Sequence, residues 1–265
     1  MLLMMAALLV IGAFTGFMAG LLGVGGGMML TPFMTFLFVS AGFPEELVIK
    51  MALATSLTTI LFTSVTSVRA HHQSGKVRWD IVKPMGVGAF WGTFIGANFA
   101  SALKSEWLAI FFAVFVGYSA INMFRTAKPK PSREVPGAAS LAAVGSGVGF
   151  ISSLLGAGGG FLSTPFMVWC NVSIHQAIGT SAALGFPIAA GGLIGYVIAG
   201  LSVEHLPAWS VGYIYLPALA ACALASLITA PIGARTSHRM NVGFLKRVFA
   251  LLLLTLAVYM ASRAF

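Results

Sequence analysis

The stretch "GVGGGMMLTPFM", residues 23–34, places four glycines and a proline between two apolar runs. Residues 156–167, "GAGGGFLSTPFM", repeat the same arrangement in the second half of the chain. Glycine permits backbone conformations that a helix does not use, and proline lacks the N–H that a helix interior needs. Each copy therefore predicts a point where an apolar helix is interrupted.

The composition predicts a membrane protein. The chain has 265 residues, of which 58% are hydrophobic and 8% are charged, whereas soluble domains have roughly 25% charged residues. Apolar stretches recur along the whole chain, and about 20 such residues cross a hydrocarbon core. We therefore expect an all-α polytopic protein whose surroundings are the lipid bilayer. Its net charge of +9 lies mostly in short loops, so no nucleic-acid partner is expected.

The two glycine clusters belong to a longer internal repeat. Placing residue 23 on residue 156 also aligns the apolar residues before the clusters, and further on "ALATS" at 52–56 aligns with "AIGTS" at 177–181. The expected organisation is a first membrane repeat, a cytoplasmic linker and a second membrane repeat. Their expected bounds are 1–125, 126–137 and 138–265.

Each half contains five apolar segments. The second segment of each half is short for a full crossing, which predicts a tilted short helix or one arm of a re-entrant hairpin. The segments are roughly 2–22, 28–41, 47–69, 80–102 and 107–124, then 138–155, 161–172, 174–199, 208–232 and 244–262.

The loop charges predict how the halves are oriented. The loop after the third segment is basic in the first half and has no Lys or Arg in the second, while the loop after the fourth segment shows the opposite bias. Because basic loops stay in the cytoplasm, we expect two inverted-topology repeats with both termini outside. The alternative is eight helices arranged as 4+4, which would make the halves parallel. In the first half, the loop after the third segment carries Arg69, Lys76, Arg78 and Lys83, and the loop after the fourth carries only Lys104. In the second half, the loop after the fourth segment carries Arg235, Arg239, Lys246 and Arg247.

Inverted repeats with interrupted helices are typical of transporters with a binding site near the bilayer midplane. Amides freed at the start of a half-helix suit an anion, since the helix dipole is positive there. Alternatively the glycines only allow helices to touch, and the hydroxyls bond to their own helix. The candidate substrate-binding residues are Gly25, Gly26, Gly27, Thr31, Thr55, Ser56, Gly158, Gly159, Gly160, Thr164, Thr180 and Ser181.

Other glycines recur at intervals of four, which predicts close helix packing. These are Gly12, Gly16 and Gly20 in the first segment and Gly88, Gly92 and Gly96 in the fourth.

No enzymatic motif accompanies these features. The glycine clusters complete neither a dinucleotide nor a phosphate-binding motif, and HExxH and GxSxG are absent. Cys170 and Cys222 stand in apolar surroundings and are expected to be core residues. His71 and His72 lie in a basic stretch and are expected to be solvated. We therefore expect neither an enzyme nor a bound metal or cofactor.

Two copies of G-x-G-G-G followed by a proline, each trailed by a Thr-Ser pair, resemble the TauE/SafE family of sulfite exporters, also called the toluene-sulfonate uptake permease family. The resemblance covers essentially the whole chain. It implies a bacterial or archaeal inner-membrane carrier for sulfur-containing anions such as sulfite, sulfoacetate, other sulfonates or thiosulfate. The family is often described with about eight helices. Position by position, the resemblance implies roles for the glycine clusters 23–27 and 156–160 and for Thr55, Ser56, Thr180 and Ser181.

The sequence thus predicts a secondary transporter, an exporter, which moves a small anion by alternating access. An inside-negative membrane potential drives anions outward by about 2.3 kcal/mol per charge per 100 mV. The alternatives are a passive anion channel, or a membrane-embedded assembly factor or enzyme. The sequence leaves the anion, the coupling ion and the oligomeric state open.

Overall fold

The computed structural model describes residues 2–22, 26–124, 133–236 and 242–263. Within these ranges it has ten helices and one short hairpin, and each predicted apolar segment corresponds to one helix. The elements are α1 (Leu2–Leu22), α2 (Gly27–Ser40), α3 (Glu45–Gln73), α4 (Trp79–Ala102), α5 (Ser105–Phe124), α6 (Ala138–Leu155), α7 (Gly160–Trp169), α8 (Ile174–Gly200), β1 (Ser210–Val211), β2 (Ile214–Tyr215), α9 (Leu216–Thr236) and α10 (Val242–Ala261).

One predicted segment, 208–232, is wrong at its beginning, because α9 starts only at Leu216. The residues before it form the antiparallel hairpin of β1 and β2. Trp209 and Gly212 have φ values of 68° and 54°, and this left-handed backbone cannot continue a right-handed helix.

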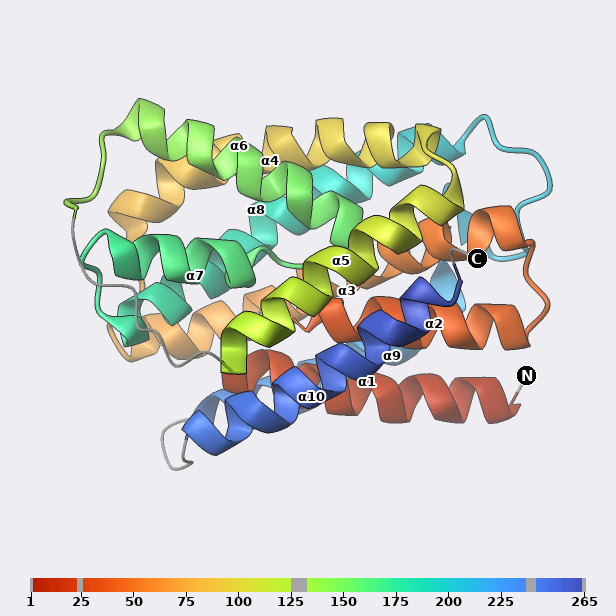
Figure 1. Ribbon diagram of the computed structural model, residues 1–265, viewed down its shortest axis with the longest axis horizontal. Coiled ribbons are helices and arrows are strands. Elements are labelled where there is room, and N and C mark those ends of the chain that lie inside the picture. The colour runs from red at the N-terminus through yellow and green to blue at the C-terminus, as the bar shows by residue number, and fades with distance from the viewer. Residues whose placement is uncertain (1, 23–25, 125–132, 237–241, 264–265) are drawn as a thin grey trace.

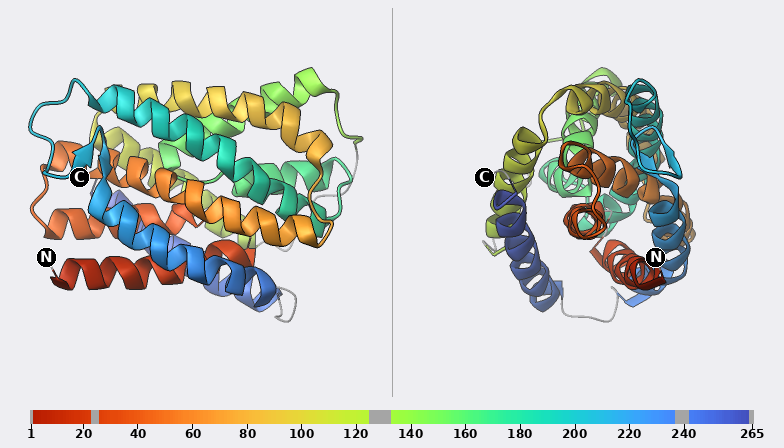
Figure 2. Two further views of the ribbon diagram at one scale, coloured as in Figure 1. Left: turned by 180° about the vertical axis from the view of Figure 1, so that it is seen from behind. Right: turned by 90° about the vertical axis from the view of Figure 1, so that its right-hand side faces the viewer.

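The helices run lengthwise along the molecule, and both marked termini lie at the same end (Figures 1 and 2). The long helix α3 starts at that end and runs to the other, whereas α8 runs in the opposite direction (Figure 1). The contacts agree, since Gly185 of α8 lies against Ser64 of α3 and Gly192 lies against Leu57. Two long antiparallel helices, one from each half, therefore pack together along the bundle.

Small residues bring the first helix of each half against the fourth helix of the other half. Gly12 and Gly16 of α1 contact Cys222 and Ser226 of α9, so a side chain at either glycine would overlap that helix. Gly88 and Gly92 of α4 contact α6 in the same way, at Ala142 and Ser146. The predicted packing role of these four glycines is confirmed. The first helix of each half thus packs against the fourth helix of the other half.

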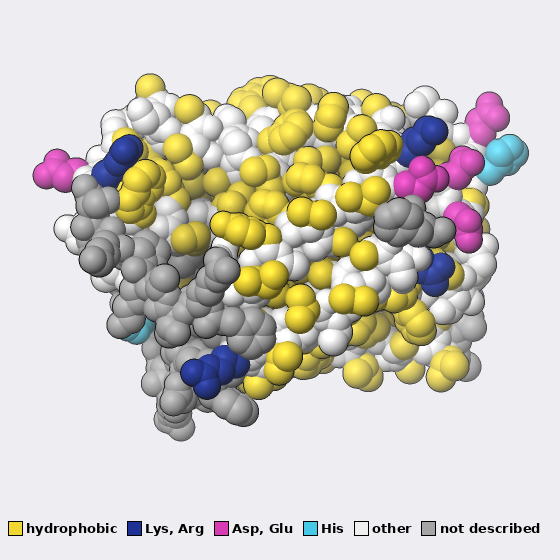
Figure 3. Space-filling model, in the orientation of Figure 1, with side chains coloured by type: hydrophobic (Ala, Val, Ile, Leu, Met, Phe, Trp, Pro, Cys, Tyr) yellow, Lys and Arg dark blue, Asp and Glu magenta, His cyan; other side chains and the backbone are white. Residues whose placement is uncertain are grey.

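The surface matches a bilayer. Six helices are long and apolar enough to cross a membrane, namely α1, α3, α5, α6, α8 and α9, and two shorter stretches, Gly27–Ser40 and Arg247–Ala261, are also apolar. Figure 3 shows hydrophobic side chains over the middle of one face, with charged side chains toward its two ends. Large apolar residues such as Trp91, Ile95 and Trp107 are exposed. Such a surface is stable in lipid and costly in water, so the chain is a multi-pass membrane protein.

Candidate functional site

Both predicted helix interruptions are present in the described residues. The chain leaves α1 at Leu22 and begins α2 at Gly27, and it leaves α6 at Leu155 and begins α7 at Gly160. Gly26 and Gly159, which precede α2 and α7, have φ values of 55° and 74°. Only glycine adopts this left-handed conformation without strain. Residues 23–25, which include the candidate Gly25, lie outside the described residues.

The two interruptions are in contact with each other. A Cβ atom on Gly27 would overlap the carbonyl oxygen of Gly156 and would lie 2.9 Å from the Cα of Ala157. Gly156 itself has a φ of 62°, and a Cβ there would overlap Thr31 Oγ1. The absence of side chains at both glycines therefore allows the start of α2 to lie against the connection between α6 and α7.

Hydroxyl groups of the first half bind the carbonyl groups that the second interruption leaves free. Ser56 Oγ lies 3.0 Å from Gly156 O and 3.2 Å from Gly27 O, so its single proton can be donated to either carbonyl group or shared between them. Thr31 Oγ1 donates to Leu155 O at 3.2 Å. A helix end inside a membrane needs such partners because no water is available to its backbone groups. Ser56 and Thr31 thus bind the two interruptions together.

A second hydroxyl cluster lies at the start of α7. Ser181 Oγ is 2.7 Å from both Ser163 Oγ and Thr164 Oγ1, and Ser163 Oγ donates to Gly159 O at 3.0 Å. Three neighbouring hydroxyl groups therefore connect α8 to the half-helix α7. Sequence reasoning selected Ser181 and Thr164 but missed Ser163, which precedes Thr164 directly.

The two predicted threonines of α3 and α8 make matching contacts. Tyr215 N donates to Thr55 Oγ1 at 3.1 Å, and Arg78 N donates to Thr180 Oγ1 at 3.0 Å. Tyr215 and Arg78 are the residues directly before α9 and α4. Each threonine therefore accepts a hydrogen bond from the backbone that leads into the fourth helix of the other half.

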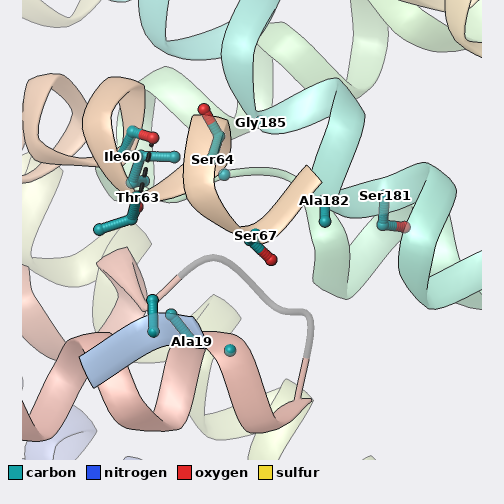
Figure 4. A pocket seen from close by; sticks show the side chains of 11 residues that line it. Ala19, Ile60, Thr63, Ser64, Ser67, Ser181, Ala182 and Gly185 are labelled. Atoms are coloured by element: carbon teal, nitrogen blue, oxygen red, sulfur yellow. Dashed lines mark hydrogen bonds between the residues drawn. The ribbon is translucent and has the colours of Figure 1, made fainter. Parts of the chain in front are cut away.

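A small pocket lies beside the second interruption, between α3, α8, α1 and α9 (Figure 4). It has room for little more than one water molecule. Of the predicted site residues it contains Gly158 and Ser181, and all its described lining residues are uncharged. They are Ala19, Gly20, Ile60, Thr63, Ser64, Ser67, Gly158, Ser181, Ala182, Gly185 and Ala230.

The hydroxyl groups that α3 contributes to this pocket were missed by sequence reasoning. Thr63 and Ser64 lie four and three residues before Ser67, so both share a face of the helix with Ser67. The signal was available, because three hydroxyl residues at helical spacing are unusual in an apolar segment that must cross a membrane.

The expectation that His71 and His72 are both solvated is wrong for His71. Its side chain is only 5% exposed, because α3 extends to Gln73 and successive side chains of a helix point about 100° apart. His72 is exposed, and its Nδ1 accepts a hydrogen bond from Trp79 Nε1 at 3.2 Å. One histidine therefore faces the protein interior and the other faces outward.

The remaining titratable and thiol groups near the helix ends have ordinary structural roles. The Arg78 guanidinium donates to the Asp80 carboxylate at 2.6 and 2.8 Å and thereby lowers the pKa of Asp80. Cys170 and Cys222 are free and buried, as predicted. No cluster of metal-ligating side chains occurs among the residues with described positions.

Interrupted half-helices that meet inside a multi-pass helical bundle, with hydroxyl groups around them, define the class of membrane transporters. A family model described as "Sulfite exporter TauE/SafE" matches residues 8–260. The chain belongs to this family.

Similar proteins from bacteria and archaea agree with this assignment. A "Probable membrane transporter protein" of Haemophilus influenzae is 35% identical over 254 residues, which are 95% of this chain and 96% of that protein. "Probable membrane transporter protein MJ0441" of Methanocaldococcus jannaschii is 25% identical over 264 residues, 98% of this chain and 96% of that protein. No solved structure matches this chain. The family and these relatives support a membrane transporter.

Proposed function

We propose that the protein is a secondary transporter that exports small sulfur-containing anions, such as sulfite, sulfoacetate or other sulfonates, across the inner membrane of a bacterium or archaeon. The observation that carries this proposal is the contact between the two glycine interruptions, at Gly27 and Gly156. The hydroxyl group of Ser56 contacts Gly156 O in this region, and that of Ser181 contacts Ser163 Oγ at the start of α7. The substrate-binding role of all twelve candidate residues is part of the proposal.

The chemistry of this region favours an anion over a cation. Two half-helices, α2 and α7, begin there, and helix N-termini attract negative charge. The described lining of the adjacent pocket offers hydroxyl groups and no carboxylate. A cation would find no counter-charge among these groups, whereas an oxyanion would find hydrogen-bond donors.

The mechanism that we propose is alternating access between two inverted repeats, 1–125 and 138–265, joined by a cytoplasmic linker at 126–137. Three observations support it: the opposite charge bias of equivalent loops, the opposite directions of α3 and α8, and the matching bonds at Thr55 and Thr180. Because the two halves make equivalent contacts, each half can take up the conformation of the other. A single site between them then opens first to one side of the membrane and then to the other.

A transport assay tests the function. Purified protein in proteoliposomes is offered labelled sulfite, thiosulfate, sulfoacetate, taurine and sulfate, and uptake is measured with and without an excess of unlabelled anion inside. We expect saturable uptake of at least one sulfur-containing anion and acceleration by the internal anion. Movement of a cation or an amino acid, with none of these anions moving, would refute the proposal. Uptake that never saturates and is indifferent to internal anion would favour a channel.

An accessibility experiment tests the orientation of the repeats. Single cysteines at residues 130 and 204 are labelled with an impermeant thiol reagent in intact cells, in a background without Cys170 and Cys222. We expect residue 204 to react from outside and residue 130 to react only after the cells are opened. Reaction of both positions from the same side contradicts the inverted arrangement.

A further inference from the structure

The hydroxyl-bearing face of α3 that lines the pocket has no counterpart at the aligned positions of α8. The repeat aligns Ser56 with Ser181. In the same alignment, Thr63 and Ser67 of α3 correspond to Ile188 and Gly192 of α8. The α8 positions are apolar and closely packed, since Leu57 already fills the space beside Gly192. The face that carries the hydroxyl groups of Thr63, Ser64 and Ser67 is therefore a feature of α3 and not of α8.

Ser67 differs from the other hydroxyl residues of this face. Thr63 Oγ1 and Ser64 Oγ donate back to their own helix, to Ile60 O at 3.2 Å and Leu61 O at 3.0 Å. Ser67 is only 7% exposed, and its hydroxyl has no hydrogen-bond partner in the described part of the chain. Figure 4 shows its side chain pointing away from α3 into the space between Ala19 and Ala182. A hydroxyl group that bonds to no described protein group has its proton available for a ligand that enters the pocket.

We propose that Ser67 donates a hydrogen bond to an oxygen atom of the transported anion and that this pocket selects small inorganic oxyanions. This inference rests on the proposed function and deepens it. The pocket is narrow, so a compact anion such as sulfite needs the least separation of α3 from α1, whereas a bulky sulfonate needs much more. The ammonium group of taurine would be left without a carboxylate among the described lining residues, and an unpaired charge in such a site is costly.

The test compares Ser67→Ala with a control on the same helix. Thr58→Val removes a buried hydroxyl nine residues away, half a turn around α3 and therefore on the opposite face. Its Oγ1 bonds only to its own helix, at Ala54 O, and it does not line the pocket. Both variants and Ser67→Thr, which keeps the hydroxyl group, are reconstituted in proteoliposomes, and initial rates are measured against sulfite concentration.

Loss of one hydrogen bond to a charged ligand raises KM about tenfold. We expect this rise for Ser67→Ala, little change for Thr58→Val, and an intermediate or wild-type KM for Ser67→Thr. We also expect sulfite and thiosulfate, but not taurine or toluenesulfonate, to compete with labelled sulfite in the wild-type protein. If the wild type transports sulfite and Ser67→Ala has an unchanged KM, the role of Ser67 is refuted while the proposed function stands. Competition by taurine as strong as by sulfite refutes the selectivity. A wild type that moves no sulfur-containing anion refutes the proposed function and, with it, this site.

Discussion

The contact between the two interruptions predicts that Gly27→Ala destabilises the protein strongly. The new methyl group would overlap the carbonyl oxygen of Gly156 and would lie 2.8 Å from Ile60 Cδ1 and 2.9 Å from Ala157 Cα. Two of these three atoms belong to the backbone of the second interruption, which cannot rotate away as a flexible side chain can. The substitution therefore forces α2 away from the connection between α6 and α7.

The size of the effect follows from this geometry. Adding a methyl group to a closely packed site typically costs 1–3 kcal/mol, and a backbone obstacle favours the upper end, about 3 kcal/mol. For a chain of this length, 1 kcal/mol corresponds to roughly 2–4 °C in Tm, so we expect Gly27→Ala to lower Tm by roughly 6–12 °C. Gly147→Ala is the matched control, because a Cβ there meets nothing within 4 Å. In the middle of α6 that change favours the helix by up to about 1 kcal/mol.

The assay is thermal unfolding of the purified proteins in the same detergent, followed by circular dichroism, with sulfite uptake by reconstituted protein as a second measurement. We expect Gly27→Ala to lose both stability and transport, and Gly147→Ala to keep both. A Gly27→Ala protein that melts within about 2 °C of the wild type would mean that the two interruptions do not pack as described.

Two further variants test the hydrogen bonds around this centre by the same unfolding measurement. Tyr196→Phe removes a buried hydroxyl that donates to Ser153 O at 2.9 Å and should lower the free energy of unfolding by about 1–2 kcal/mol. Tyr118→Phe, at an exposed position, should leave the stability unchanged. Equal Tm values for the two variants would contradict the role of the Tyr196 bond. Ser56→Ala leaves the carbonyl group of Gly156 without its hydroxyl donor and should cost about 1–3 kcal/mol, so an unchanged Tm would show that another group satisfies that carbonyl.

Much of the local structure was predictable because each signal lies in neighbouring residues. Glycines followed by a proline predict an interruption, and α2 and α7 begin within one residue of the predicted 28 and 161. The exception is the start of α9, where hydrophobic residues continue through the β1–β2 hairpin and only the left-handed backbone at Trp209 and Gly212 ends the pattern. Hydropathy does not distinguish an apolar hairpin from an apolar helix.

The partners of the candidate site residues were not predictable in the same way. Ser56 and Gly156 are 100 residues apart in sequence, and Thr180 binds the backbone of Arg78 from 102 residues away. Nothing local to a threonine in an apolar helix tells whether its hydroxyl bonds to its own helix, to another helix or to a ligand. His71 and His72 illustrate the same limit, since only the length of α3 and its packing decide which of the two is buried.

By itself, the sequence determined a duplicated membrane protein with an interrupted helix in each half. The reason is that composition, the internal repeat and the glycine clusters can all be read from the order of residues along the chain. Only the tertiary structure decided that the interruptions at Gly27 and Gly156 touch, and that hydroxyl groups of α3 and of Ser181 in α8 line the space beside them. The physical reason is that both facts depend on how helices from the two halves approach each other. That approach is set by the shapes of facing surfaces, which no single segment contains.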